Sequence, residues 1–238
     1  MENTGYVALS LAVGLQRKMD IVANNIANVD TSGYKSSNML FKEYVVNERN
    51  QKPLSMVEDY GNYRNFDPGT IQTTENPLDV ALIGNGFMSV NTPTGEKYTR
   101  NGSMHINPTG QLVTSAGEAI NDTGGKPIVI PPNSSNISIV PDGTISADGQ
   151  PIGRLKVVKF ANPQLLSPVG NNLYTTDQAG VPDDATSVTQ GALEGSNVNS
   201  VIEMTNMIEV MRKYESVARI LQTEHDSQSG MIQRLAKI

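Results

Sequence analysis

Residues 24–35 read NNIANVDTSGYK, and this stretch decides the fold because a long amphipathic helix has to stop inside it. Asp30, Thr31 and Ser32 favour hydrogen bonds from their side chains to the local backbone, and Gly33 favours positive φ. These preferences do not suit the interior of a helix. The helix is therefore predicted to end by about Val29.

Upstream of that stop, apolar residues recur at alternating spacings of four and three. This spacing places them along one side of a helix; they are Ala8, Ala12, Leu15, Met19, Val22, Ile26 and Val29. Three neutral amides, Asn24, Asn25 and Asn28, lie on another side, where a surface helix would normally carry Lys and Glu. The amide cluster indicates either contact with protein or a solvated cap.

The stretch at 24–35 resembles the N-terminal signature of the bacterial flagellar axial proteins of the rod and hook. Three further blocks are similar to that family in order and position: residues 76–90 (NPLDVALIGNGFMSV), 98–114 (YTRNGSMHINPTGQLVT) and 191–213 (GALEGSNVNSVIEMTNMIEVMRK). The length, with no large central insertion, resembles the proximal rod members more than the hook members. The distal rod members are the nearest alternative.

The composition limits the classes of function. The 238 residues suffice for one or two domains, and they are 37% hydrophobic but only 5% aromatic, with 21 Gly and 13 Pro. A formal net charge of -6 disfavours nucleic acid as a partner, because no basic surface is indicated. The absence of cysteine excludes disulfides, thiol nucleophiles and Cys-ligated metals.

The N-terminus lacks the basic region and the continuous apolar run of a cleaved signal peptide, and no apolar run reaches the ~20 residues of a membrane span. The residues alone would indicate a cytoplasmic protein. The resemblance implies something else: export through the flagellar type III apparatus without signal cleavage, and assembly in the periplasm with other rod proteins and copies of itself.

The pattern predicts an α+β fold in four parts. An N-terminal helix (1–30) and a C-terminal helix (193–238) are expected to pair as a coiled-coil-like helical domain. Between them come an extended connector (31–75), with a strand only at 41–46, and a mostly antiparallel β domain (76–192). Strands of that domain are predicted at 78–83, 87–90, 111–114, 128–130, 137–140 and 154–160, separated by Gly, Pro and Asn turn signals.

The connector is the most aromatic part of the chain, which favours docking of its aromatic side chains on neighbouring subunits.

The C-terminal helix carries two adjacent apolar seams. Ser200 and Glu203 form a candidate capping box at its start, and Gly230 is a candidate kink or end. One seam holds Met207, Val210, Tyr214, Val217, Leu221, Met231, Leu235 and Ile238; the other holds Val201, Met204, Ile208, Met211 and Ala218. Either one seam faces the N-terminal helix and the other a neighbouring subunit, or both form one wide core stripe within the monomer.

Little in the sequence indicates catalysis or cofactor binding. His105 and His225 are not at a metal-ligand spacing, and the pair Asp183 and Asp184 reads as a solvated loop. Residues 84–87 (GNGF) lack the third glycine of a nucleotide-binding loop and read as a hairpin turn. No catalytic, cofactor-binding or metal-binding residue is therefore predicted.

The leading hypothesis is a structural subunit of the flagellar proximal rod that assembles helically and transmits torque from the motor to the hook. A distal rod subunit is the alternative, and less favoured alternatives are a cell-wall glycan hydrolase and a rod assembly cap. The predicted assembly interface comprises Leu15, Met19, Val22, Asn24, Asn25, Ile26, Asn28, Gly33, Tyr34, Lys35, Met204, Met207, Ile208, Met211, Tyr214, Val217, Leu221 and Leu235.

Overall fold

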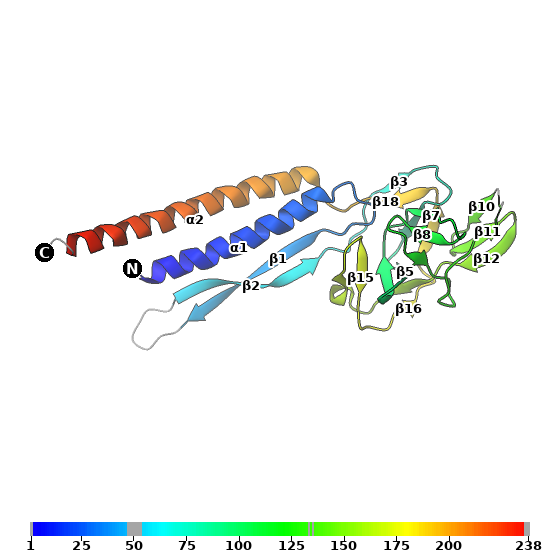
Figure 1. Ribbon diagram of the computed structural model, residues 1–238, viewed down its shortest axis with the longest axis horizontal. Coiled ribbons are helices and arrows are strands. Elements are labelled where there is room, and N and C mark those ends of the chain that lie inside the picture. Colours follow the sequence, from blue (N-terminus) through cyan, green and yellow to red (C-terminus); the bar gives the residue numbers. More distant parts are fainter. Residues whose placement is uncertain (1, 47–53, 133, 135, 236–238) are drawn as a thin grey trace. The chain divides into compact units, whose positions relative to one another are not determined.

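The computed structural model describes residues 2–46, 54–132, 134 and 136–235. The chain divides into two compact units. The helical unit comprises residues 1–27, 37–64 and 199–238, and the β unit comprises residues 28–36 and 65–198. Long helices near both ends and a mostly antiparallel β region between them confirm the predicted α+β class (Figure 1).

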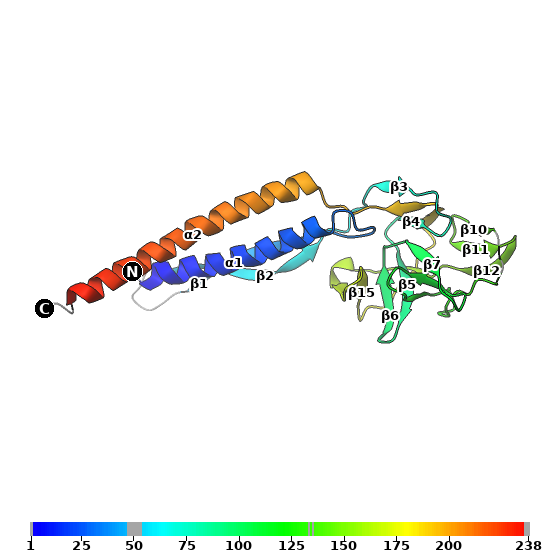
Figure 2. The ribbon, with the colours of Figure 1, turned by 45° about the horizontal axis from the view of Figure 1, so that its top comes forward.

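In the helical unit, helix α1 (Glu2–Ala27) packs along helix α2 (Ser200–Leu235), as Figure 2 shows. Their shared core is built from one side of each helix: Ala8, Ala12, Leu15, Val210 and Val217, flanked by Leu11, Met19, Tyr214 and Leu221. This core confirms the predicted seam of α1 from Ala8 to Met19 and the first seam of α2 from Val210 to Leu221, whereas Val29 lies beyond the end of α1. A supercoiled geometry for the pair stays a prediction.

The second side of α1 packs on a β-hairpin that the sequence pattern largely missed. Strand β1 (Ser37–Val46) pairs antiparallel with β2 (Leu54–Arg64), with a bulge after Leu40. The hairpin lies against α1 beside Gly14, where an added Cβ would come within 3.1 Å of the Phe41 ring and 3.7 Å of Val57. The predicted strand at 41–46 is thus the end of a longer one, and residues 47–53 lie outside the described part of the chain.

The β unit is made of short antiparallel strands. Within the described residues they are β3 (Ile71–Thr73), β4 (Val80–Ile83), β5 (Phe87–Thr92), β6 (Gly95–Thr99), β7 (Met104–Ile106), β8 (Leu112–Thr114), β9 (Ala119–Ile120), β10 (Ile137–Ile139), β11 (Thr144–Ala147), β12 (Gln150–Arg154), β13 (Val157–Lys159), β14 (Ser167–Pro168), β15 (Leu173–Thr175), β16 (Val181–Pro182), β17 (Ser187–Gln190) and β18 (Ala192–Glu194). A short 3-10 helix spans Pro163–Leu165.

The largest sheet of the β unit runs in the order β14-β15-β6-β5-β9-β8-β7. Strand β13 also pairs with β5, and β16 pairs with β13. Smaller pairings are β10-β11-β12, β17-β4 and β18-β3. The main hydrophobic core of the β unit includes Val80, Leu82, Met88, Val90, Leu112, Ile120, Ile145 and Leu155. A second cluster packs aromatic rings in edge-to-face and tilted arrangements, with the ring centroid of Phe87 about 6 Å from those of Phe66, Phe160 and Tyr174.

Two strand predictions were wrong in detail. Residues 128–130 form no regular strand and instead make the isolated bridge between Gln111 and Val129. Residues 154–160 are interrupted after Arg154, where β12 ends, and β13 resumes at Val157. Ile128, Ile130, Leu155, Val158 and Phe160 are buried although Val129 is exposed, so most of the hydrophobic signal was real although the regular strand pairing was not.

The start and the course of α2 also differ from the prediction. The Oδ1 atom of Asn199 accepts hydrogen bonds from the N–H groups of Val201 (3.1 Å) and Ile202 (3.2 Å), so Asn199 and not Ser200 is the N-cap. The helix also continues through Gly230 to Leu235. A single glycine in a long helix costs only about 1 kcal/mol, which is too little to end it.

We expect Gly102→Ala to destabilise the β unit. An added Cβ would lie 1.7 Å from the carbonyl oxygen of Val80, which is a core residue. The Gly102 carbonyl also accepts a hydrogen bond from the Val80 N–H at 3.0 Å, so the two backbones are held close together. The free energy of unfolding should fall by about 3 kcal/mol, as in an overpacked core. Urea denaturation followed by circular dichroism measures the change.

Gly153→Ala is the matched control in the same unit, because its nearest neighbour would be a side-chain atom at an ordinary 3.7 Å. Its effect should stay within about 0.5 kcal/mol. Equal stability of the two variants would contradict the close approach of Gly102 to Val80.

Candidate functional site

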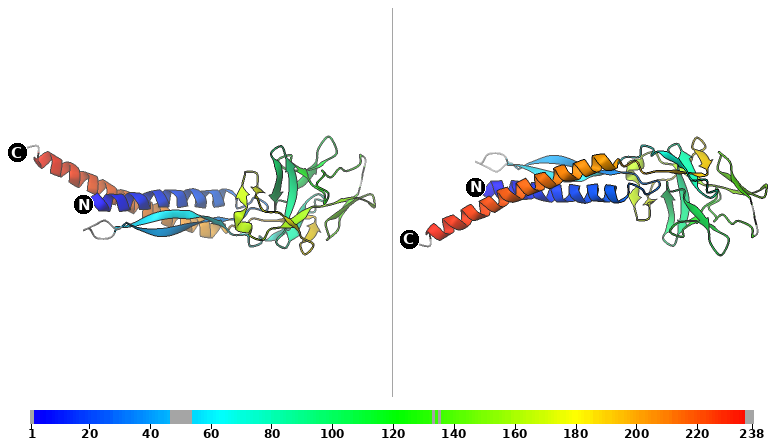
Figure 3. Two further views of the ribbon diagram at one scale, coloured as in Figure 1. Left: turned by 90° about the horizontal axis from the view of Figure 1, so that it is seen from below. Right: turned by 90° about the horizontal axis from the view of Figure 1, so that it is seen from above.

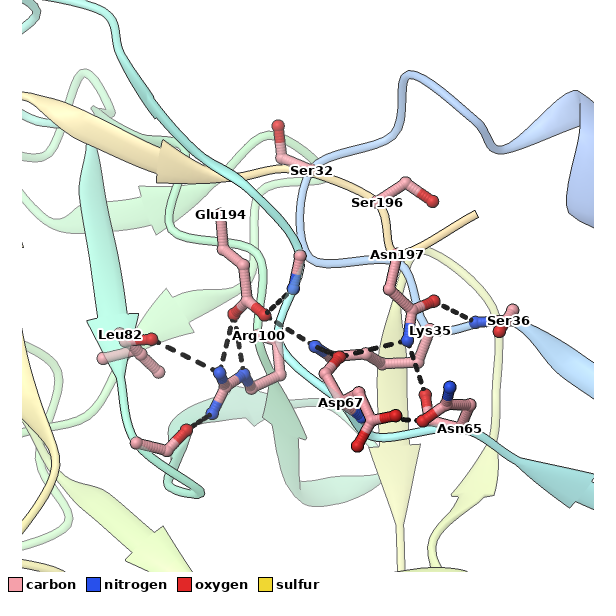
Figure 4. A network of polar contacts seen from close by, with 12 residues as sticks. Ser32, Lys35, Ser36, Asn65, Asp67, Leu82, Arg100, Glu194, Ser196 and Asn197 are labelled. Atoms are coloured by element: carbon pink, nitrogen blue, oxygen red, sulfur yellow. Dashed lines mark hydrogen bonds and ion pairs between the residues drawn. The ribbon is translucent and has the colours of Figure 1, made fainter. Parts of the chain in front are cut away.

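The most closely connected site in the β unit is a buried ionic cluster of Lys35, Glu194 and Arg100. The Lys35 ammonium lies 2.6 Å from Glu194 Oε1, and the Arg100 guanidinium places Nη2 at 2.7 Å and Nε at 2.9 Å from Oε2. The N–H of Gly69 donates to Oε1 at 3.0 Å. Figure 4 shows the carboxylate between the two cations, and all three side chains are at most 3% exposed.

Arg100 and Lys35 also donate hydrogen bonds to backbone carbonyl oxygens. Arg100 Nη1 donates to the oxygens of Gly84 (2.7 Å) and Gly86 (2.6 Å), and Lys35 Nζ donates to that of Asp67 (2.8 Å). Burial lowers the pKa of Lys35, and the hydrogen bond and charge of Glu194 oppose that shift. Because every charge in the cluster has close partners, we interpret it as a structural joint and not a reactive centre.

The conformation and the surroundings of residue 33 require a glycine. It adopts φ +70, its N–H donates to the Glu194 carbonyl at 2.8 Å, and an added Cβ would lie 2.5 Å from the carbonyl carbon of Arg100. A larger residue would push the turn away from the cluster. Tyr34, also buried, follows and leads directly into Lys35.

Asn197 holds the neighbouring backbone of the β unit. Its Oδ1 accepts the N–H of Ser36 at 2.8 Å, and its Nδ2 donates to the carbonyls of Asn65 (2.9 Å) and Asp67 (3.0 Å) (Figure 4). One amide thus fixes segments that are far apart in the sequence.

In the helical unit, the side-chain amide of Asn25 likewise binds backbone groups. It is 1% exposed, its Oδ1 accepts the N–H of Ser37 at 3.0 Å, and its Nδ2 donates to the Ser37 carbonyl at 2.9 Å. Asn24, by contrast, is exposed, and Asn28 accepts a hydrogen bond from the Thr31 hydroxyl at 3.2 Å within the turn. Asn25 thus contacts protein within its own chain, while a role of the amide cluster between subunits stays a prediction.

The structure distributes the residues of the predicted assembly interface among three environments. Buried within the chain itself are Leu15, Val22, Asn25, Gly33, Tyr34, Lys35 and Val217; half-buried are Met19, Ile26, Asn28, Met207, Tyr214 and Leu221; exposed are Asn24, Met204, Ile208 and Met211. Leu235 ends α2, and its side chain lies outside the described part of the structure. A role for any of them between subunits stays a prediction.

The sequence analysis did not single out Arg100, Glu194 or Asn197. All three stand inside the blocks at 98–114 and 191–213, so the signal was present in the motifs. Their pairing with Lys35 could not be seen, because a charged residue in a turn-rich segment reads as solvated.

The described residues offer neither a metal-binding group nor a membrane-spanning helix. No group of three or more His, Asp or Glu side chains is arranged to hold a metal ion. Neither described helix combines the length and apolarity needed to cross a membrane.

Comparison with known proteins gives the family. Three family models match: "Flagella basal body rod protein" at residues 6–35, "Flagellar hook protein FlgE/F/G D1 domain" at 81–147 and "Flagellar basal body rod FlgEFG protein C-terminal" at 189–234.

Proteins that are similar to nearly the whole chain have the same family names. The flagellar basal-body rod protein FlgF of Caulobacter vibrioides is 38% identical over 100% of both chains, and that of Escherichia coli is 31% identical over 95% of this chain and 96% of its own. FlgG of Buchnera aphidicola subsp. Baizongia pistaciae is 34% identical over 93% of this chain and 94% of its own. The chain belongs to the family of flagellar basal-body rod proteins, which makes it a structural subunit of that rod.

We expect Glu194→Ala to destabilise the β unit strongly, because it leaves the charges of Lys35 and Arg100 buried without a counter-charge. Loss of one partner of a buried pair costs about 3–5 kcal/mol. Urea denaturation measures the loss.

Asp184→Ala is the matched control, since its ion pair with Arg154 at 2.8 Å lies on the surface, with the Asp184 side chain 80% exposed. Its effect should be below about 1 kcal/mol. Similar losses for the two variants would show that the cluster is not a buried joint.

Proposed function

We propose that this chain is a subunit of the proximal rod, which assembles helically in the periplasm and transmits torque from the motor to the hook. The observation that carries the proposal is the match to a FlgF protein over the full length of both chains at 38% identity. The FlgG relatives match 93% or 94% of this chain, which makes a distal rod subunit the second candidate.

Unpartnered apolar surface on α2 supports assembly through packing. Four residues of the helix form an exposed line, here called the α2 stripe: Val201, Met204, Ile208 and Met211, between 46% and 72% exposed. Exposed apolar lines of this kind are typical of protein–protein interfaces. Contacts between different surfaces of successive subunits produce an open helical assembly.

The ionic cluster supports the mechanical part of the proposal. A subunit that transmits torque must resist local deformation, and Glu194 holds segments 33–36, 65–69 and 194–197 together with short charge-assisted hydrogen bonds. Loss of the Glu194 carboxylate would leave the charges of Lys35 and Arg100 buried without a counter-charge. The proposed partners are other rod proteins, copies of this chain and, during export without signal cleavage, the flagellar type III apparatus.

A cell-wall glycan hydrolase is a weaker candidate. A pocket of about 240 Å³ is lined by Asp142, Asp183 and Asp184 together with Arg154 and Lys156. A glycosidase needs one carboxyl group that holds a proton near neutral pH. Burial would raise the pKa of Asp183, but hydrogen bonds from Thr186 and Ala185 and the nearby Lys159 lower it overall, so this carboxyl does not suit a general acid.

The test is the location of the protein in isolated basal bodies. We expect a chain carrying a small epitope on the β unit to be labelled in the rod close to the motor, and cells lacking the chain to be non-motile. Label near the hook would indicate a distal rod subunit. Label only at the growing tip of incomplete rods would indicate an assembly cap, and release of fragments from purified peptidoglycan would indicate a hydrolase.

A further inference from the structure

The helical unit has a second unpartnered apolar surface, a groove between α1 and β2. It has a volume of about 400 Å³ and is lined by Tyr6, Leu9 and Val13 of α1 and by Met56 of β2, with the charged groups of Arg17 and Glu58 also part of its lining. The three α1 side chains are between 48% and 60% exposed. We call this surface the α1–β2 groove.

The α2 stripe lies on the far side of its helix from α1. At 100° per residue, the four residues of the stripe lie between about 100° and 180° around the helix from Val210, which forms the core against α1 with Val217, so the stripe does not face α1. The α1–β2 groove belongs to a third side of α1, between the side that packs on α2 and the side that packs on the hairpin. Within the helical unit, Figure 3 shows α2 crossing α1 and the hairpin along another side. A chain therefore cannot place its own stripe in its own groove.

We propose that the α2 stripe of one copy docks in the α1–β2 groove of the next copy. This inference rests on the proposed function and names the two surfaces that meet. The stripe is a convex line with spacings of three, four and three, and the groove presents apolar side chains at spacings of three and four, so ridges of one helix can enter grooves of the other.

The chemistry of the two surfaces is complementary. Met204 and Met211 carry flexible thioether side chains, which fill irregular apolar surfaces, and Met sulfur makes favourable contacts with aromatic rings such as that of Tyr6. Ile208 lies between them and adds the branched apolar bulk that Leu9 and Val13 need for burial. Both members of the pair are present on this one chain, and the proposal therefore takes a second copy as the occupant.

The arrangement also sets the type of assembly. Because the stripe and the groove are different surfaces on different sides of the unit, their contact is heterologous and does not use up the second surface of either copy. Each added copy presents a new free surface. The contact therefore extends into a row of subunits and does not stop at a symmetric dimer.

Cysteine crosslinking tests the pairing, and the absence of natural cysteine removes background reaction. The chain carrying Leu9→Cys and Ile208→Cys is made as the only copy in the cell, and isolated basal bodies are treated with a short bismaleimide. We expect a ladder of crosslinked chains, and mass spectrometry should find both cysteines in one linked peptide from two copies. The matched control is Leu9→Cys with Ile220→Cys, because Ile220 is 50% exposed on a different side of α2.

The outcomes separate this inference from the proposed function. Basal bodies that contain the chain but give no ladder, a ladder of equal strength in the control, or a linked peptide from another rod protein would each overturn the pairing and leave the rod assignment intact. Absence of the chain from basal bodies would overturn both.

A mixing experiment tests the heterologous geometry. Leu9→Asp blocks only the groove and Ile208→Asp blocks only the stripe, so each variant still docks through its intact surface and ends the row. Each should reduce motility in cells that also make the unaltered chain, whereas the double variant should have no effect and Ile220→Asp should also have none. All these positions are exposed, so circular dichroism should match the unaltered chain. A double variant as inhibitory as the single ones would overturn the proposal.

Discussion

The carboxylate of Glu194 is the point on which the organisation of the β unit depends. Moving one carboxylate and two cations out of water costs several kcal/mol for each ion, and short contacts to Lys35, Arg100 and the Gly69 N–H offset that cost. The net contribution to stability is therefore small, while removal of any one charge is costly. The cluster acts by making one arrangement of its segments far better than any other, which is the property that a rigid subunit of a mechanical assembly needs.

The shape of the turn at 28–36 follows from that cluster. The turn must bring Lys35 beside a carboxylate 159 residues away in the sequence. Positive φ at Gly33 allows the close approach to Arg100, and two amides, Asn25 in the helical unit and Asn197 in the β unit, satisfy the backbone of the residues that follow. Buried backbone polar groups need such partners at the start of β1 and in the turn before it, where regular pairing does not satisfy them all.

The sequence predicted the parts of the fold that depend on local periodicity. The seam of α1 and the Val210 side of α2 repeat every 3.6 residues, and the β unit is punctuated by turn residues, so both were found. The hairpin β1–β2 was largely missed because exposed Tyr44, Tyr60 and Leu40 hide the alternation that a half-buried strand normally shows. The ionic cluster was missed because its members are paired by the tertiary fold, which no spacing rule records.

The two kinds of surface in this chain have opposite roles, and their chemistry fits those roles. Inside the ionic cluster of the β unit, contacts are directional and charged, so they define one geometry and tolerate little displacement. On the helical unit, the α2 stripe and the α1–β2 groove are apolar, so the contacts proposed for them are non-directional and would adapt to a neighbour whose orientation changes slightly. An assembly that turns under load needs subunits that keep their internal shape while the contacts between them adjust. Under the proposed function, the distribution of polar and apolar groups along this chain would provide that combination.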